Sequence, residues 1–146
     1  MLTRRVFLVG TSALVGACAL PWQASRAAEA PIKLRELYNK DRSFSDLALA
    51  NEGRRITVEG YMAPPLKADA RFFVLTKMPM ATCPFCEPGV EWPRTILPVY
   101  TRRTVDVVPF NVPITATGTL DLGEFTDPDT GFWSKVRLGN ARYERT

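Results

Sequence analysis

The segment "PITATGTLDLG" (residues 113–123) has the most regular pattern in the chain and decides the predicted fold. Small or apolar residues alternate with polar ones, as they do when successive side chains of a β-strand point to opposite faces. Gly118 lies on the apolar side, which is typical of a strand that bends sharply around a small barrel. The two faces are Ile114, Ala116, Gly118 and Leu120 on one side, and Thr115, Thr117, Thr119 and Asp121 on the other.

Strand-like patterns continue on both sides of this segment. "RRITVEGYM" (54–62) alternates in the same way and has Gly60 inside it. "DPDTG" (127–131) predicts a tight turn. Pro98 and Pro109 place two further segments at sheet edges or bends. The remaining strand candidates are "RFFVLTK" (71–77), "TILPVY" (95–100), "TVDVVPF" (104–110) and "FWSKVRL" (132–138), the last continuing into "ARYER" (141–145).

Five or six short strands with turn residues between them predict an all-β fold. Closure into a barrel removes the unpaired strand edges that so short a chain would otherwise expose. We therefore expect an OB-like β-barrel over residues 54–146. Residues 28–53 are expected to form a short N-terminal helical segment, in which Ser43 and Asp46 have the spacing of a capping box.

Residues 1–27 have the order of a secretory signal: a basic start, an apolar run from Val6 to Leu20, and small residues after it. The paired arginines followed by Phe-Leu indicate the twin-arginine branch of export, with the mature chain beginning at Ala28. The alternative is lipoprotein processing at Cys18, which ends the lipobox-like stretch "VGAC" and would anchor the protein to a membrane. Both routes predict a periplasmic protein.

The composition excludes several classes of function. The chain has no histidine, which removes Ser-His-Asp and Cys-His nucleophiles and any imidazole metal ligand. Removal of residues 1–27 takes away three of the 19 basic residues and none of the 15 acidic ones, so the mature chain carries a net charge of about +1. Nucleic-acid binding relies on clustered positive charge, and this balance gives it little support.

The stretch "MPMATCPFCEP" (78–88) carries the most distinctive chemistry, because two thiols stand three residues apart among prolines. Proline removes amide donors and fixes φ, so an irregular loop is expected here. Three interpretations remain open. A structural disulfide between Cys83 and Cys86 agrees with an exported location. A redox dithiol is the second, because thiol–disulfide oxidoreductases use the Cys-x-x-Cys spacing.

The third interpretation is a metal site. Two thiolates at this spacing provide half of a tetrahedral Zn²⁺ site, which Glu87, Glu91, another chain or a partner protein could complete. Met78 and Met80 would instead suit Cu⁺, a soft ion that prefers sulfur ligands. Zinc and copper are therefore the candidate cofactors. Arg102 and Arg103 could also meet an anionic ligand, although a solvated connection between strands explains them more simply.

Taken together, "ITVEGYMAPP", "RFFVLTK", "CPFC" and "VPITATGTLDLG…DPDTGFWSKVRL" resemble an uncharacterised family of exported bacterial proteins with an OB-like barrel. The resemblance spans roughly residues 44–143. Members of that family occur beside envelope ABC transporters, some of which are linked to zinc supply. The resemblance thus implies an exported, transport-associated protein.

From these observations we expect a periplasmic binding or accessory protein that is not an enzyme. It would help an envelope transport system to handle a metal, with the Cys83–Cys86 loop as its functional surface. The expected partner is a transporter component or another periplasmic protein, and contact with a membrane is expected only if Cys18 is lipidated. The alternatives are a thiol–disulfide oxidoreductase and a plain interaction module with a structural disulfide.

Overall fold

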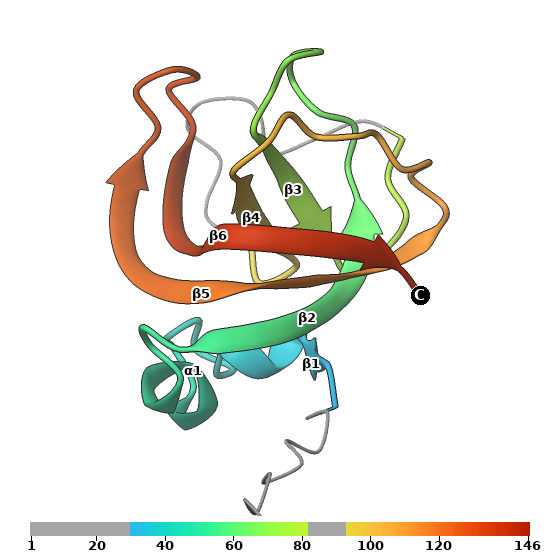
Figure 1. Cartoon of the computed structure of the whole chain (residues 1–146). Coiled ribbons are helices and arrows are strands. Elements are labelled where there is room, and N and C mark those ends of the chain that lie inside the picture. The colour runs from blue at the N-terminus through green and yellow to red at the C-terminus, as the bar shows by residue number, and fades with distance from the viewer. Residues whose placement is uncertain (1–29, 82–92) are drawn as a thin grey trace, which may run out of the picture.

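The structure is a computed structural model that describes residues 30–81 and 93–146. The proposed signal segment, Cys18, and the Cys83, Cys86, Glu87 and Glu91 positions lie outside the described residues. The elements, in chain order, are β1 (Ile32–Lys33), the 3-10 helix η1 (Leu34–Leu37), α1 (Asp46–Ala50), β2 (Arg55–Met62), β3 (Phe72–Thr76), β4 (Ile96–Thr101), β5 (Pro113–Thr126) and β6 (Trp133–Arg145) (Figure 1).

Five of these strands close into a barrel. The neighbours run β2–β3–β4–β6–β5, and β5 pairs again with β2, which completes the ring (Figure 1). All pairings in the ring are antiparallel except that of β4 with β6, which is parallel. Relative to the first barrel strand, this is the order 1-2-3-5-4-1 of an OB-fold. The expected all-β, OB-like barrel is confirmed, and β1 adds a short parallel strand outside the ring, against β2.

The barrel interior is filled by the alternating apolar residues of its strands. In β2 every second residue from Ile56 to Met62 is buried, and β5 repeats the pattern from Ile114 to Leu120, as the sequence predicts. Buried side chains from β3, β4 and β6 meet them across the ring. The largest fully buried residues in the barrel strands are Phe73, Met62, Leu75, Ile96, Leu97, Ile114, Leu120 and Leu138.

Two glycines allow the backbones to approach closely inside this barrel. A Cβ atom on Gly60 would lie 2.7 Å from the Thr76 carbonyl oxygen and 2.8 Å from the Leu75 Cγ atom. A Cβ atom on Gly118 would lie 2.9 Å from the Ala141 Cβ atom. No real Cβ atom tolerates such contacts, so these positions require glycine for steric reasons. The bends expected at both positions are therefore also sites of tight strand packing.

The outer face of β3 and β4 is covered by the protein's own aromatic side chains. All five residues of β3 are buried. Phe72 stacks on Tyr100 with ring centroids 5.2 Å apart, and Phe132, which precedes β6, packs on Phe72 at 5.4 Å. OB-folds commonly bind ligands on this face. Here the turn between β5 and β6 folds over it and fills it with Phe132.

That turn has the structure predicted for "DPDTG". The Asp127 carboxylate accepts hydrogen bonds from the amides of Asp129 and Thr130, at 2.8 and 3.1 Å. Gly131 donates its amide to the Asp127 carbonyl and has a φ of 72°, in the left-handed region. Both features are those of a turn closed by its aspartate side chain.

Two expectations for local structure are wrong. Residues 104–110 form no strand. Val105 and Val108 are buried while Val107 is 60 % exposed, so the buried positions are three apart rather than two, and Pro109 offers no amide for a sheet. The helix cap is Ser45 rather than Ser43, and its side chain accepts the Ala48 amide at 3.2 Å.

The N-terminal segment contains less helix than its pattern indicates. Its first described elements are the short strand β1 and the helix η1, with Leu34 and Leu37 buried against the barrel. The helix α1 covers only five residues before Asn51 caps it. No helix in the described part of the chain is long and apolar enough to cross a membrane.

Candidate functional site

A large pocket lies between the loop after β4 and the last residues of β6. It has a volume of about 870 Å³, within the range typical of ligand sites. Five arginines line it against only two acidic residues, so its charge is strongly positive. The lining residues are Arg55, Thr101, Arg102, Arg103, Thr104, Asp106, Val107, Val108 and the consecutive residues 140–145. We call this site the arginine pocket.

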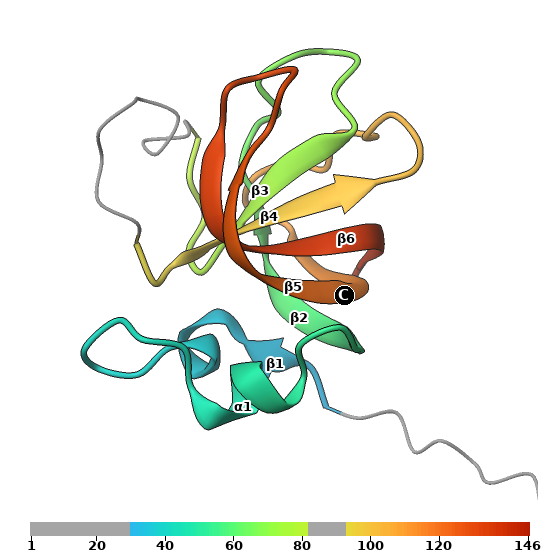
Figure 2. The same ribbon diagram turned by 90° about the vertical axis from the view of Figure 1, so that its left-hand side faces the viewer.

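The pocket exists because β4 and β6 separate. Their parallel pairing ends at Thr101 and Ala141, and β6 then continues alone along β5. At Asn140 the register of β6 contains one extra residue, and its φ is 50°. Such a bulge bends a strand and increases its twist. The end of β6 thereby leaves β4 (Figure 2). Residues of the loop that follows β4 line the opposite side of the pocket.

This loop is held in place by its own contacts. The Tyr143 hydroxyl accepts the Asp106 amide at 2.7 Å and donates to the Asp106 carbonyl at 2.9 Å. The Thr101 hydroxyl lies 2.9 Å from the Arg71 carbonyl oxygen and 2.6 Å from that of Arg103, and it can donate its one proton to either. Val108 donates its amide to the Met62 sulfur at 3.4 Å. The wall that carries Arg102 and Arg103 is therefore anchored to the barrel.

Tyr143 connects the floor of the pocket to the core. Its ring packs edge-on against Phe73 with centroids 5.1 Å apart, inside the barrel. Burial raises the pKa of its hydroxyl, the hydrogen bond from the Asp106 amide opposes this, and the Asp106 charge raises the pKa further. The hydroxyl is therefore protonated at neutral pH and can serve both as donor and as acceptor.

The arginines differ in how firmly they are placed. Arg55 donates from its guanidinium group to the carbonyl oxygens of Asn140 and Thr117, at 3.2 and 3.3 Å, and so braces the bulge. Within residues 30–81 and 93–146, Arg102, Arg103, Arg142 and Arg145 form no ion pair with a described carboxylate. These four guanidinium groups are exposed and available to a ligand.

The pocket contains only part of what the sequence predicted as a site. Arg102 and Arg103 do line it. Arg55, Arg142 and Arg145 were not singled out, because each occupies an outward position of a strand, where an arginine is ordinary. Only the closure of the barrel brings the start of β2 and the end of β6 to the same loop. No pattern local to the sequence signals that meeting.

The described part of the cysteine loop lies elsewhere. Lys77 donates its amide to the Thr95 carbonyl at 2.9 Å, and Thr76 pairs with Ile96, so the loop leaves the barrel at the start of β4. The arginine pocket begins where β4 ends, about 16 Å along the strand. Met78 is 60 % exposed and Met80 is half-buried. Among the described residues, no three acidic or cysteine side chains cluster as metal ligands would.

Comparison with known proteins provides a similar fold but no information about the pocket. No family model and no curated protein matches the chain. A solved structure, that of a DUF3299 family protein from Pseudomonas aeruginosa PAO1, is similar with a TM-score of 0.50. The match covers 81 % of this chain and 97 % of that one, at 16 % sequence identity. The likeness is therefore one of fold, to a protein from a family that is itself uncharacterised.

Proposed function

We propose that this chain is a binding protein that takes up an anionic ligand in the arginine pocket. The observation that carries the proposal is the gathering of five arginines around one cavity whose walls are anchored to the barrel. Arginine presents a planar fork of donors that matches carboxylate and phosphate groups in pairs of hydrogen bonds. No lysine lines this pocket, so its charge comes entirely from the residue best suited to such recognition.

The barrel favours binding in this pocket over binding on the outer face of β3 and β4, where OB-folds commonly bind their ligands. The outer surface of β3 and β4 is occupied by Phe72, Tyr100 and Phe132. At the seam between β4 and β6, in contrast, the pocket is open and most of its lining residues are polar. A ligand entering there would displace water from exposed guanidinium groups without disturbing the core.

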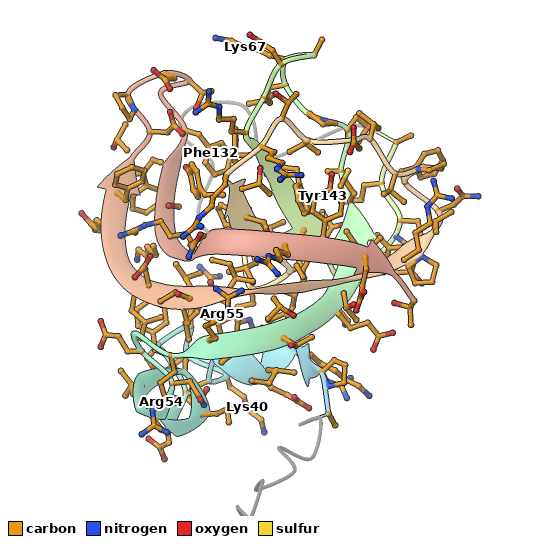
Figure 3. The ribbon with its side chains drawn as sticks, in the orientation of Figure 1. Lys40, Arg54, Arg55, Lys67, Phe132 and Tyr143 are labelled. Carbon is orange, nitrogen blue, oxygen red and sulfur yellow. The ribbon has the colours of Figure 1, made fainter. Side chains whose placement is uncertain are left out.

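The test compares two double variants that remove the same charge. Arg102→Gln with Arg103→Gln changes the pocket, and Lys40→Gln with Arg54→Gln is the control, because these residues lie beside the N-terminal helices, away from Tyr143 (Figure 3). Binding of tripolyphosphate and of citrate is measured by calorimetry at fixed salt. We expect the pocket variant to lose about tenfold in affinity or more, and the control to stay within about twofold.

Equal losses in the two variants would mean that the anions respond to overall charge and not to a site. No binding of either anion to the wild type would also overturn the proposal. Circular dichroism of each variant verifies that the barrel is intact, which is expected because all four residues are exposed.

A second candidate function rests on the cysteine loop. We propose that the chain is exported, belongs to the same family as its structural neighbour, and assists an envelope transporter in handling zinc or copper through Cys83 and Cys86. The exposure of Met78 supports this, because a methionine that only anchored the loop to the core would be buried.

Elemental mass spectrometry and a free-thiol count on the exported protein test this second role. Stoichiometric zinc or copper that is lost in the Cys83→Ser, Cys86→Ser variant would support it. A metal-free protein with a readily exchanging disulfide would favour the oxidoreductase instead.

A further inference from the structure

One edge of β6 is left open inside the arginine pocket. On its other edge β6 pairs with β5 as far as Arg145, opposite Ile114. On the pocket side the pairing with β4 stops at Ala141, and no described strand accompanies residues 142–145. Unpaired strand edges are templates for pairing with another chain, and native proteins usually cover or shorten them.

The direction of the backbone groups follows from a single hydrogen bond. Thr146 donates its amide to the Pro113 carbonyl, so this amide faces β5. Amides point alternately to the two sides of a strand, so those of Arg142 and Glu144 also face β5. The amides and carbonyls of Tyr143 and Arg145 therefore face the pocket. They are spaced as in any β-strand, and no described strand pairs with them.

We propose that the pocket receives an extended, acidic peptide segment of a partner protein, which pairs with β6 as an additional strand. The inference rests on the proposed function and specifies its ligand. Backbone hydrogen bonds to Tyr143 and Arg145 would give the segment its alignment, as in other cases of strand addition. Carboxylates on the segment would pair with Arg102, Arg103 and Arg142 on the two walls.

The lining of the pocket favours a peptide over a nucleic acid. Of the lining residues only Tyr143 is aromatic, and its ring is packed against Phe73, so no free ring is available for base stacking. Val107 is 60 % exposed on the loop and offers an apolar contact for a side chain of the segment. An open backbone edge, an apolar contact and arginines on both walls are what an acidic strand can use at once.

The experiment uses the wild-type chain and short synthetic peptides in which glutamate alternates with threonine. Amide hydrogen exchange is followed by NMR with and without peptide. We expect the Tyr143 and Arg145 amides to become at least about tenfold more protected, while the Arg142 and Glu144 amides, already paired with β5, change little. Affinity is then measured for two peptides of equal charge, N-methylated at odd or at even positions. One of them should lose about tenfold, because only one set of amides faces β6.

The outcomes separate this inference from the proposed function. If both methylated peptides bind as well as the parent, or if Tyr143 and Arg145 stay unprotected, strand addition is wrong although the pocket still binds anions. Tripolyphosphate or a single-stranded oligonucleotide binding where the peptide does not would also overturn it. If no anion binds, both proposals fail together. Arg142 is exposed and lines the pocket, so Arg142→Gln should lower the affinity for the peptide while leaving the core intact.

Discussion

At the scale of single residues, the barrel depends on places where a side chain would not fit. Gly60 lies against the backbone of β3, and neither the Thr76 carbonyl nor the buried Leu75 can move away without disturbing the sheet. Gly139 is different, because the atom nearest to its Cβ position is the flexible end of the Asp121 side chain, at 2.9 Å. The two glycines thus make a matched pair.

We predict that Gly60→Ala lowers the free energy of unfolding by about 1–3 kcal/mol, the usual cost of overpacking a core. Gly139→Ala should change it by no more than about 0.5 kcal/mol. Urea denaturation of the two variants measures the difference. Equal effects would show that β2 and β3 are less closely packed than their contacts indicate.

Tyr100 is the second residue from which stability can be predicted. Its hydroxyl is buried and no described atom meets it with good hydrogen-bond geometry, although the Asp127 carboxylate is near enough for its charge and an imperfect hydrogen bond to raise the pKa of Tyr100. Removing an unsatisfied buried hydroxyl relieves a desolvation penalty, so Tyr100→Phe should stabilise the protein by about 1 kcal/mol. A loss of stability of that size would instead indicate a hydrogen bond to Asp127.

The same residue predicts the response to alkaline pH. Burial and the Asp127 charge raise the pKa of Tyr100 well above its ordinary value of 10.0. Folding thus favours the neutral phenol. Its contribution to the free energy of unfolding is fully present below pH 10 and is lost progressively as the pH rises above 10. Thermal melts between pH 8 and 11 should show falling stability above pH 10, with a smaller slope in Tyr100→Phe. Tyr143, whose pKa is also raised, would account for the slope that remains.

At the scale of elements, the helix α1 depends on one cap. The Ser45 hydroxyl accepts the Ala48 amide and donates to the Glu36 carbonyl at 2.6 Å, so it joins α1 to η1. Ser45→Ala should therefore destabilise the protein by about 1 kcal/mol. Ser43→Ala is the control, since among the described residues the Ser43 hydroxyl bonds only to Asp41 and Asn39, at the surface. Chemical denaturation measures the free energy of unfolding of both variants. A larger loss in Ser43→Ala than in Ser45→Ala would mean that Ser43 is the cap.

The strands themselves could be predicted because each carries its own period. β2 alternates throughout, β5 alternates as far as Leu120, and β6 alternates up to its bulge at Asn140. The glycines inside β2 and β5 and the aspartate turn between β5 and β6 have chemical signatures of their own. Residues 104–110 were misassigned because a valine-rich run satisfies the same propensities whether it pairs or only anchors a loop. The arginine pocket was beyond prediction for another reason: β2, the loop after β4, and the end of β6 meet only once the ring is closed.

At the scale of the whole molecule, the arginine pocket and the described residues that flank the cysteine loop lie at opposite ends of β4. The cysteine loop leaves at Thr76 and returns at Ile96, while the arginine pocket begins beyond Thr101 (Figure 2). We predict that replacing both Cys83 and Cys86 by serine leaves the affinity for tripolyphosphate within about twofold, because the described residues that flank this segment lie at the other end of β4 from the pocket, and separate sites contribute additively. A marked change would indicate that the loop reaches the pocket. Calorimetry on the quadruple variant, with Arg102→Gln and Arg103→Gln added, completes the cycle.

The parallel contact between β4 and β6 also bears on how the chain reaches its native state. β5 and β6 are neighbours in the sequence and are joined by a short turn, so their pairing costs little loop entropy. The β4–β6 pairing joins segments that are farther apart in the sequence, so we expect it to form later in folding. Leu120→Ala, in the hairpin, should therefore slow refolding, and Val99→Ala, at the seam, should mainly accelerate unfolding. Stopped-flow rates for the two variants would reveal the sequence of events. If the measured rates match these expectations, the β4–β6 pairing forms last during folding and breaks first during unfolding. The barrel would then open at the seam that is lined by the arginine pocket.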